Sequence, residues 1–376
     1  MNSLPSFDRI ADNLEMARED SPPDSKSVHW DVFPPHYCDA VRSTEYWPYF
    51  LRNALSYGFN DSLNFSNQAK ALMSGRMDAE ASHADVDPYR QIRTNHDYRP
   101  LLPERLNVSE NRGQMEKIRD IFLKVVQICG VEFVLSNLSP PIGSPSVVEL
   151  TFSYGDSGER AAAVNYHDLY LTYYAWLINQ VTGKTFDNGV RIIVEIGAGY
   201  GGLAAKLKDL NPGAKVIVFD LPEINAVQTY YLTRRFPACE IRLYDDFKRS
   251  GVEVFHDRAV DFIVLPGWSI EELPGNFVDL AVNVRSMMEM NATTIDDYFR
   301  HLHRTVRPGG LFACFNRYTK EPGNIRIKNY PYDDRWKILL SQTSNLQSHI
   351  HELVTQRTEA PQKFTLKDAL RSLPPF

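Results

Sequence analysis

From residue 190 onward, short apolar runs alternate with amphipathic segments of helical length. This alternation predicts βαβ units, in which helices cover both faces of a largely parallel sheet. Seven runs have the length and composition of strands, at residues 191–196, 215–220, 260–265, 278–283, 311–315, 336–341 and 352–357. We expect the last two to form a hairpin-like pair at the edge of the sheet.

The first 185 residues have a different pattern of apolar positions. Apolar positions recur at helical spacing between Met115 and Cys129 and again between Leu169 and Leu177, and a glycine that can cap the helix follows each segment. We therefore predict two parts. Residues 1–185 form a mainly α-helical lid and acceptor-binding region, a candidate for homodimer contacts, and residues 186–376 form the α/β domain.

Composition limits the classes of partner. The chain has 41 basic and 47 acidic residues and a net charge of -6, so it has no general attraction for nucleic acid or for an anionic membrane. No apolar run approaches the roughly 20 residues of a bilayer span. The four cysteines are far apart and have no zinc spacing, and the N-terminal segment lacks the features of a secretory signal. We expect a cytoplasmic protein that acts on a small molecule and holds no metal.

The most specific motif is a glycine-rich loop at residues 195–202 (EIGAGYGG), between a predicted strand and a predicted helix. Its spacing is ambiguous. Gly197, Gly199 and Gly202 satisfy the G-x-G-x-x-G pattern of dinucleotide sites, whereas Gly197, Gly199 and Gly201 satisfy the looser G-x-G-x-G pattern of S-adenosylmethionine sites. The loop alone therefore leaves two cofactors open.

The neighbours of the loop favour one of them. Glu195, at the end of the strand, can accept hydrogen bonds from the ammonium of a methionyl group and would repel a pyrophosphate. Asp220 ends the next strand and can accept both ribose hydroxyls of either cofactor. The turn at residues 307–310 (RPGG) and the two strands after it match a seven-stranded methyltransferase sheet. S-adenosylmethionine is the predicted cofactor, and an NAD(P)-dependent oxidoreductase is the alternative from another class.

At this point the chain resembles a known superfamily. Residues 190–317 resemble a class I S-adenosylmethionine-dependent methyltransferase, which implies a Rossmann-like seven-stranded domain. The motifs VEIGAGYGGLA, Asp220-Leu221-Pro222-Glu223 and Asn283-x-x-Ser286-x-x-Glu289-Met290, followed by Tyr298-Phe299, resemble those of a bacterial family of sugar O-methyltransferases.

The resemblance implies roles for individual positions. Asp220 and Leu221 would contact the ribose and adenine, Asn283 would face the sulfonium, and Trp268, in the turn after the third strand, would stack on the adenine ring. The residues expected around the methionine moiety are Glu195, Gly197, Ala198, Gly199 and Gly201.

A hydroxyl acceptor needs a base, which we expect above the carboxyl ends of the fourth and fifth strands. Glu289, with Ser286 beside it, is the first candidate for a base or substrate clamp, and its alternative role is to orient the loop. His167 is the second candidate, although its neighbours Asn165 and Asp168 also read as helix caps. The segment 316–318 is a candidate substrate contact. The basic run at residues 89–99, with Arg90, Arg93, His96 and Arg99, is a candidate phosphate clamp.

Together these features predict in-line methyl transfer to a hydroxyl of a sugar or natural product. Transfer to carbon or nitrogen of a small metabolite, including a phosphorylated one or a prenyl diphosphate, is the alternative within the superfamily.

Overall fold

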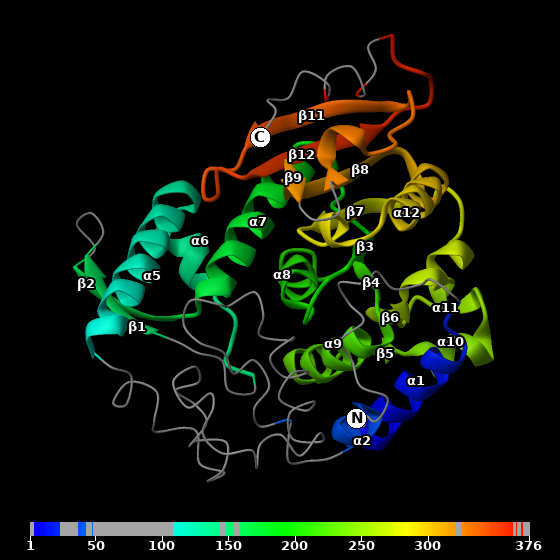
Figure 1. Cartoon of the computed structure of the whole chain (residues 1–376), viewed down its shortest axis with the longest axis horizontal. Helices are drawn as coiled ribbons and strands as arrows, with labels where there is room; N and C mark the ends of the chain where they lie inside the picture. The colour runs from blue at the N-terminus through cyan, green and yellow to red at the C-terminus, as the bar shows by residue number, and fades with distance from the viewer. Residues whose placement is uncertain are drawn as a thin grey trace. The chain divides into compact units, whose positions relative to one another are not determined.

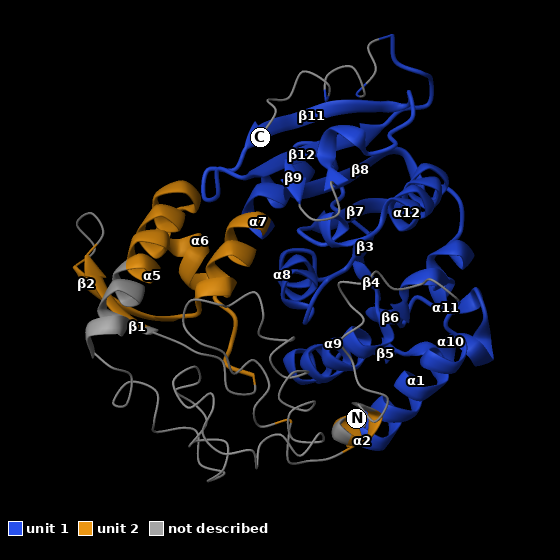
Figure 2. Cartoon of the chain, in the orientation of Figure 1, with its two compact units in different colours: residues 1–32, 175–376 blue, residues 33–174 orange. Residues whose placement is uncertain are grey.

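The structure is a computed structural model, and its chain forms two compact units (Figures 1 and 2). One unit comprises residues 1–32 and 175–376, and the other comprises residues 33–174. The domain boundary at residue 185 that the sequence suggests stays a prediction. The structure describes residues 4–22, 37–42, 47, 108–142, 148–153, 158–320, 325–363, 366 and 370.

The larger unit is built on one sheet of eight strands in the order β11-β12-β8-β7-β3-β4-β6-β5. Strands β3 to β8 run parallel, whereas β12 is antiparallel to both of its neighbours, β8 and β11. The strands are β3 (Ile192–Ile196), β4 (Lys215–Asp220), β5 (Ile241–Arg242), β6 (Phe262–Pro266), β7 (Val278–Val284), β8 (Val306–Arg317), β11 (Trp336–Thr343) and β12 (Ile350–Arg357).

This topology confirms the predicted fold class. All seven predicted strands are present, the last two form the expected antiparallel pair, and the two-residue strand β5 adds an eighth at the opposite edge. The antiparallel edge separates this sheet from the dinucleotide-binding fold, whose six strands in the order 3-2-1-4-5-6 form a mostly parallel sheet. The fold is the Rossmann-like α/β architecture that the sequence predicts.

The strands read as continuous apolar runs because helices cover both faces of the sheet. Strand β6, for example, is buried along its whole length. On one face, Phe219 and Leu265 pack in the same core cluster as Phe299 and Trp336. The covering elements are α8 (Gly202–Leu210), α9 (Pro222–Arg235), α10 (Tyr244–Ser250), α11 (Glu253–His256), η4 (Gly267–Glu272), η5 (Met287–Glu289) and α12 (Ala292–Thr305).

Helix α1 (Phe7–Glu19) belongs to this unit and packs against α9 and α10, as Figure 1 shows. The guanidinium of Arg18 donates to the fully buried Glu223 at 2.9 Å, and Arg9 forms ion pairs with Asp245 and Asp246. A buried carboxylate is costly without a partner, so Glu223 ties α1 to the start of α9.

The smaller unit contains α2 (Tyr37–Arg42), α5 (Val108–Cys129), α6 (Val131–Ser136) and the first half of α7 (Tyr166–Thr182). Gly130 and Gly183 end α5 and α7, as expected, and each donates its N–H to a carbonyl of the last turn. The unit also holds a hairpin that the sequence did not predict, made by β1 (Val148–Ser153) and β2 (Glu159–Val164). Its core includes Phe122 and Phe152, whose ring centroids lie 4.8 Å apart.

The remaining short elements follow β8. They are β9 (Thr319–Lys320), β10 (Ile325–Arg326) and η6 (Ile327–Asn329). Within the described ranges, no helix is both long enough and apolar enough to cross a membrane.

Candidate functional site

The glycine-rich loop connects β3 to α8, and its backbone decides between the two glycine patterns. Gly197, Gly199 and Gly201 have φ angles of 69°, 57° and 92°, whereas Gly202 is the first residue of α8 and has no positive φ. Residues with a Cβ rarely adopt such φ angles. The three glycines that the loop requires are therefore those of the G-x-G-x-G pattern.

Gly197 is also required for packing. A Cβ at this position would lie 2.0 Å from Oγ of Ser286 and 3.7 Å from Cε of Met290. The segment at residues 286–290 therefore lies directly against the loop, so the two sequence motifs that carry the family resemblance are neighbours in the fold.

Glu195 is 2% exposed at the end of β3. Burial, and next the charge of Asp220, raise the pKa of Glu195 to about 8, although the backbone N–H of Ala204 in the first turn of α8 opposes this rise. Its Oε2 is buried and has no hydrogen-bond partner among the described residues. A buried oxygen without a partner is unusual, so Oε2 is an acceptor that the described residues leave unused.

Asp220 ends β4 beside the same loop. Burial raises its pKa to about 7, while hydrogen bonds to its carboxylate oppose the rise. The N–H of Leu221 donates to Oδ1 at 2.8 Å, and Nε2 of Gln228 donates to Oδ2 at 2.7 Å. Gln228 also donates to the carbonyl of Gly199 at 2.8 Å. The buried amide of Gln228 thus holds the carboxylate against the loop.

No Lys, Arg or His among the described residues forms an ion pair with Glu195 or Asp220. The charge of Asp220 raises the proton affinity of Glu195, and two neighbouring carboxylates without a cation favour binding of a positive charge. Tyr298 lies near this pair, because the charge of Asp220 contributes, after burial, to raising the pKa of its hydroxyl.

Asn283, at the end of β7, is completely buried. Its Nδ2 donates to the carbonyl of Ile196 at 2.9 Å and to Oγ of Ser286 at 2.6 Å. Its Oδ1 accepts from the N–H of Met287 at 3.2 Å and from Nδ2 of Asn316 at 2.8 Å. A primary amide offers two donors and two acceptor positions, so the protein uses all of them. The predicted contact of Asn283 with a sulfonium would have to replace one of these bonds.

Asn316, on β8, completes this network. It is also fully buried, and its Oδ1 accepts from the N–H of Met288 at 3.4 Å. The two amides therefore hold the η5 turn through its N–H groups, and Ser286 donates its hydroxyl proton to the carbonyl of Ile196 at 3.1 Å. Here Ser286 fastens the turn to β3, and its predicted catalytic role stays a prediction.

Glu289 is the last residue of η5 and is 8% exposed. Its Oε1 lies 3.5 Å from Nζ of Lys320 on β9. The structure thus brings the predicted base to the carboxyl edge of β7 and β8, on a turn that packs against the glycine loop.

Trp268 lies in η4, after β6, and is partly buried against the core. Its side chain hydrogen-bonds to the hydroxyl of Tyr244, which in turn donates to Oδ2 of Asp20 at 2.9 Å. This chain of contacts links the predicted adenine-stacking residue to the end of α1. Its stacking role stays a prediction.

The remaining predicted residues belong to the smaller unit. His167 is in the first turn of α7, in the smaller unit, where Oδ1 of Asn165 accepts from the N–H groups of His167 and Asp168 as a helix cap. Asp168 accepts two hydrogen bonds from Ser139, at 2.6 and 2.9 Å. The basic run at residues 89–99 lies outside the described residues.

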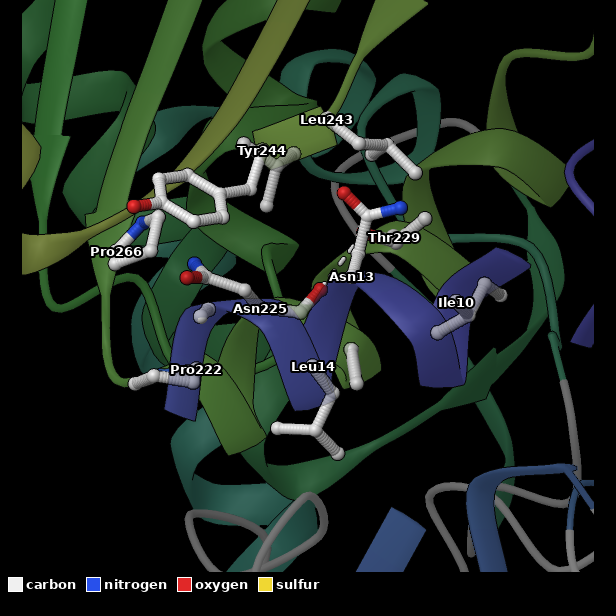
Figure 3. A pocket seen from close by; sticks show the side chains of 12 residues that line it. Ile10, Asn13, Leu14, Pro222, Asn225, Thr229, Leu243, Tyr244 and Pro266 are labelled. Carbon is white, nitrogen blue, oxygen red and sulfur yellow. Dashed lines mark hydrogen bonds between the residues drawn. The ribbon is translucent and has the colours of Figure 1, made fainter. Parts of the chain in front are cut away.

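Figure 3 shows a small pocket beside α9 that is lined mainly by α1 and α9. Its free volume of about 20 Å³ is room for about one water molecule. Oδ1 of Asn225, which lines it, is buried without a hydrogen-bond partner among the described residues. The pocket is too small for a cofactor and belongs to the packing of α1.

Sequence reasoning missed one positioning residue, Gln228. It placed Asn316 in a segment of candidate substrate contacts, whereas the buried amide of Asn316 bonds to Asn283 and to the η5 turn. Gln228 stands two helical turns beyond Asp220, in no motif, and only the packing of α9 brings its amide to the loop. The positioning role of Asn316 could have been inferred from its place as a polar residue near the end of an apolar strand, next to the strand that carries Asn283.

No protein-family model matches this sequence, and no curated protein matches it. Solved structures match parts of it. An O-methyltransferase family protein from Burkholderia thailandensis is 14% identical, with a TM-score of 0.33, over 51% of this chain and 60% of its own. Human N-acetylserotonin methyltransferase is 15% identical, with a TM-score of 0.29, over 50% of this chain and 55% of its own.

A SAM-dependent methyltransferase from Aquifex aeolicus is 12% identical, with a TM-score of 0.32, over 48% of this chain and 89% of its own. Similarity at this level identifies neither an activity nor a substrate.

Proposed function

We propose that this protein is a methyltransferase that uses S-adenosylmethionine. One observation carries the proposal: Glu195, which is buried, and Asp220, which is half-buried, lie beside a glycine loop with raised pKa values and no cationic partner among the described residues. A cofactor with a positively charged amino acid tail supplies the missing charge. A pyrophosphate would add negative charge to two carboxylates, which argues against the dinucleotide alternative.

The proposal gives each residue at the carboxyl ends of β3 and β4 a role. Glu195 accepts from the ammonium of the cofactor, and Asp220, held by Gln228, accepts from the ribose hydroxyls. Leu221 begins α9 at the adenine side, where Trp268 stands. The loop residues Gly197, Ala198, Gly199 and Gly201 let the cofactor approach the backbone closely. When bound, S-adenosylmethionine supplies an electrophilic methyl group on a sulfonium centre.

We further propose that the acceptor is a hydroxyl of a sugar or natural product and that Glu289 takes its proton. The support is positional: Glu289 ends the η5 turn, which packs on the loop and is held by Asn283 and Asn316. General base catalysis requires such fixed placement. His167 stays a second candidate for this role. Methyl transfer to carbon or nitrogen would use the same cofactor-binding residues with a different acceptor.

Calorimetry tests the cofactor directly. We expect adenosylhomocysteine, the demethylated product, to bind with a 1:1 stoichiometry and NADH to produce no heat. Clear binding of NADH without binding of adenosylhomocysteine would overturn the proposal. Incubation with methyl-labelled cofactor and a panel of acceptors, followed by NMR of the product, then locates the methyl group on oxygen, nitrogen or carbon.

A further inference from the structure

Basic side chains from three elements converge where β7 and β8 end. Arg285 directly follows β7, Arg317 is the last residue of β8, and His349 stands in the loop between β11 and β12. Burial lowers the pKa of His349, and the charges of Arg317 and Arg285 lower it further, so both guanidinium groups lie near the ring. A guanidinium nitrogen of Arg285 lies 3.5 Å from Oε1 of Gln347 in the same loop.

The backbone holds this cluster in place. The N–H of Arg285 donates to the carbonyl of Phe315 at 2.8 Å, and the N–H of Tyr318 donates to the carbonyl of His349 at 3.2 Å. Arg285 has a φ of 61°. Residues with a Cβ are strained in this region, and such strain is found disproportionately at ligand sites.

Arg317 makes no side-chain hydrogen bond or ion pair with any described residue, although its Nε is shielded from solvent. His349 forms no ion pair with them either. Glu289, the acidic residue of the adjoining η5 turn, lies against Lys320. Partial burial of an unpaired guanidinium costs free energy, which binding of an anion would offset.

We propose that Arg317, together with Arg285 and His349, binds an oxyanion group of the acceptor, either a carboxylate or a phosphate. A guanidinium presents paired N–H donors that match two oxygens of such a group. This inference rests on the proposed function and narrows its substrate class. The acceptor is then an acidic hydroxylated molecule, such as a sugar acid or a sugar phosphate, instead of a neutral sugar.

The test uses two simple probes on the full-length protein. Inorganic phosphate and malonate are titrated by calorimetry at constant ionic strength, with and without saturating adenosylhomocysteine. We expect at least one probe to bind and Arg317→Gln to weaken its binding at least tenfold. The tighter of the two probes indicates whether the acceptor carries a phosphate or a carboxylate.

Arg300→Gln is the matched control, because Arg300 is exposed on α12 and, in the part of the chain that the structure describes, pairs only with its neighbour Asp297. It should bind both probes like the wild type. Arg317→Lys keeps the charge but loses the paired donors, so we expect an intermediate affinity. Arg317→Lys also replaces Arg317→Gln as the test variant if Arg317→Gln does not fold.

Absence of binding by both probes, or equal binding by the wild type and every Arg317 variant, would overturn the inference. The proposed function fails separately, through the absence of adenosylhomocysteine binding, because the anion titrations of the free protein do not depend on that cofactor.

Discussion

The carboxyl edge of the sheet has two halves of opposite charge. The half formed by β3 and β4 carries Glu195 and Asp220, which lack a cationic partner among the described residues, whereas the half formed by β7 and β8 carries Arg285 and Arg317. The halves meet where β3 pairs with β7, the point at which the strand order reverses. Open α/β sheets bind ligands at this point.

The two halves are also stabilised differently. The acidic half relies on a local loop whose glycines adopt positive φ angles, and the basic half relies on the buried amides of Asn283 and Asn316 and on a loop from a distant hairpin. The difference supports the proposal that each half binds a group of the opposite charge. We expect mutations in one half to change cofactor affinity and mutations in the other to change turnover.

The largest expected effect concerns Glu289, which belongs to the basic half. Replacement by Gln removes the proposed base, so we expect kcat to fall by roughly 10²–10⁴. The Kd for adenosylhomocysteine should stay within about twofold of the wild type, because the side chain keeps its shape. Steady-state kinetics and calorimetry measure the two quantities. Full turnover by Glu289→Gln would show that Glu289 is not the base. His167 would then be the next candidate to test.

The second prediction concerns the junction of the halves. In Gly197→Ala the new Cβ would collide with Ser286, and the alanine would have to adopt a positive φ. Because both effects strain the folded state, we expect the substitution to lower the free energy of unfolding by about 2–4 kcal/mol. Gly213→Ala is the control, because its Cβ meets no atom within 4 Å and its φ is not positive. Denaturant unfolding compares them, and equal stability of the two variants would contradict the packing argument.

The third prediction separates binding from stability in the acidic half. Glu195→Gln removes a buried charge, so we expect it to weaken adenosylhomocysteine binding about tenfold, or roughly 1.4 kcal/mol. The same change should stabilise the cofactor-free protein at pH 8. A variant that binds the cofactor product as tightly as the wild type would show that Glu195 serves only the loop.

The smallest expected effect is the pH dependence of the same half. The folded-state pKa values of Glu195 and Asp220, about 8 and about 7, lie above their ordinary values of 4.5 and 3.8. The folded protein therefore keeps protons that the unfolded chain releases, and the stability contributed by these groups falls as the pH rises from about 4 to about 8.

Binding of an ammonium favours the ionised carboxylates, so adenosylhomocysteine affinity should rise a few-fold between pH 6 and pH 8, with proton release near pH 7. Calorimetry in buffers of different ionisation heat measures the released protons. Unchanged affinity across this range would mean that the two carboxylates are already ionised in the free protein.

Much of the acidic half could be predicted, because its signals are local in the sequence. The strand, the glycine loop and the helix follow one another within twenty residues, and Asp220 ends the next strand. The hairpin at residues 148–164 could not be found in the same way. Its second strand contains three alanines, which favour a helix, and pairing with β1 overrides that preference.

The sequence could not predict the hydrogen-bonding state of Asn283, for a different reason. The sequence places a polar residue at the end of a strand, where a ligand contact is a natural expectation. Its hydrogen bonds, however, depend on Ile196 and Asn316, which lie 87 and 33 residues away in the chain. Whether an amide is free or saturated is a property of its neighbours in space.

The amino-acid sequence by itself determined the alternation of strands and helices, the positive φ angles of the loop and the acidic residue in front of it, because periodicity and backbone sterics act over a few residues. Only the tertiary structure decided which glycine is the third of the pattern, that the hydrogen-bonding groups of Asn283 are all used, and that Arg317 and Arg285 lie near His349. The order of strands in the sheet brings those groups together, and strand order follows from burial and pairing over the whole unit.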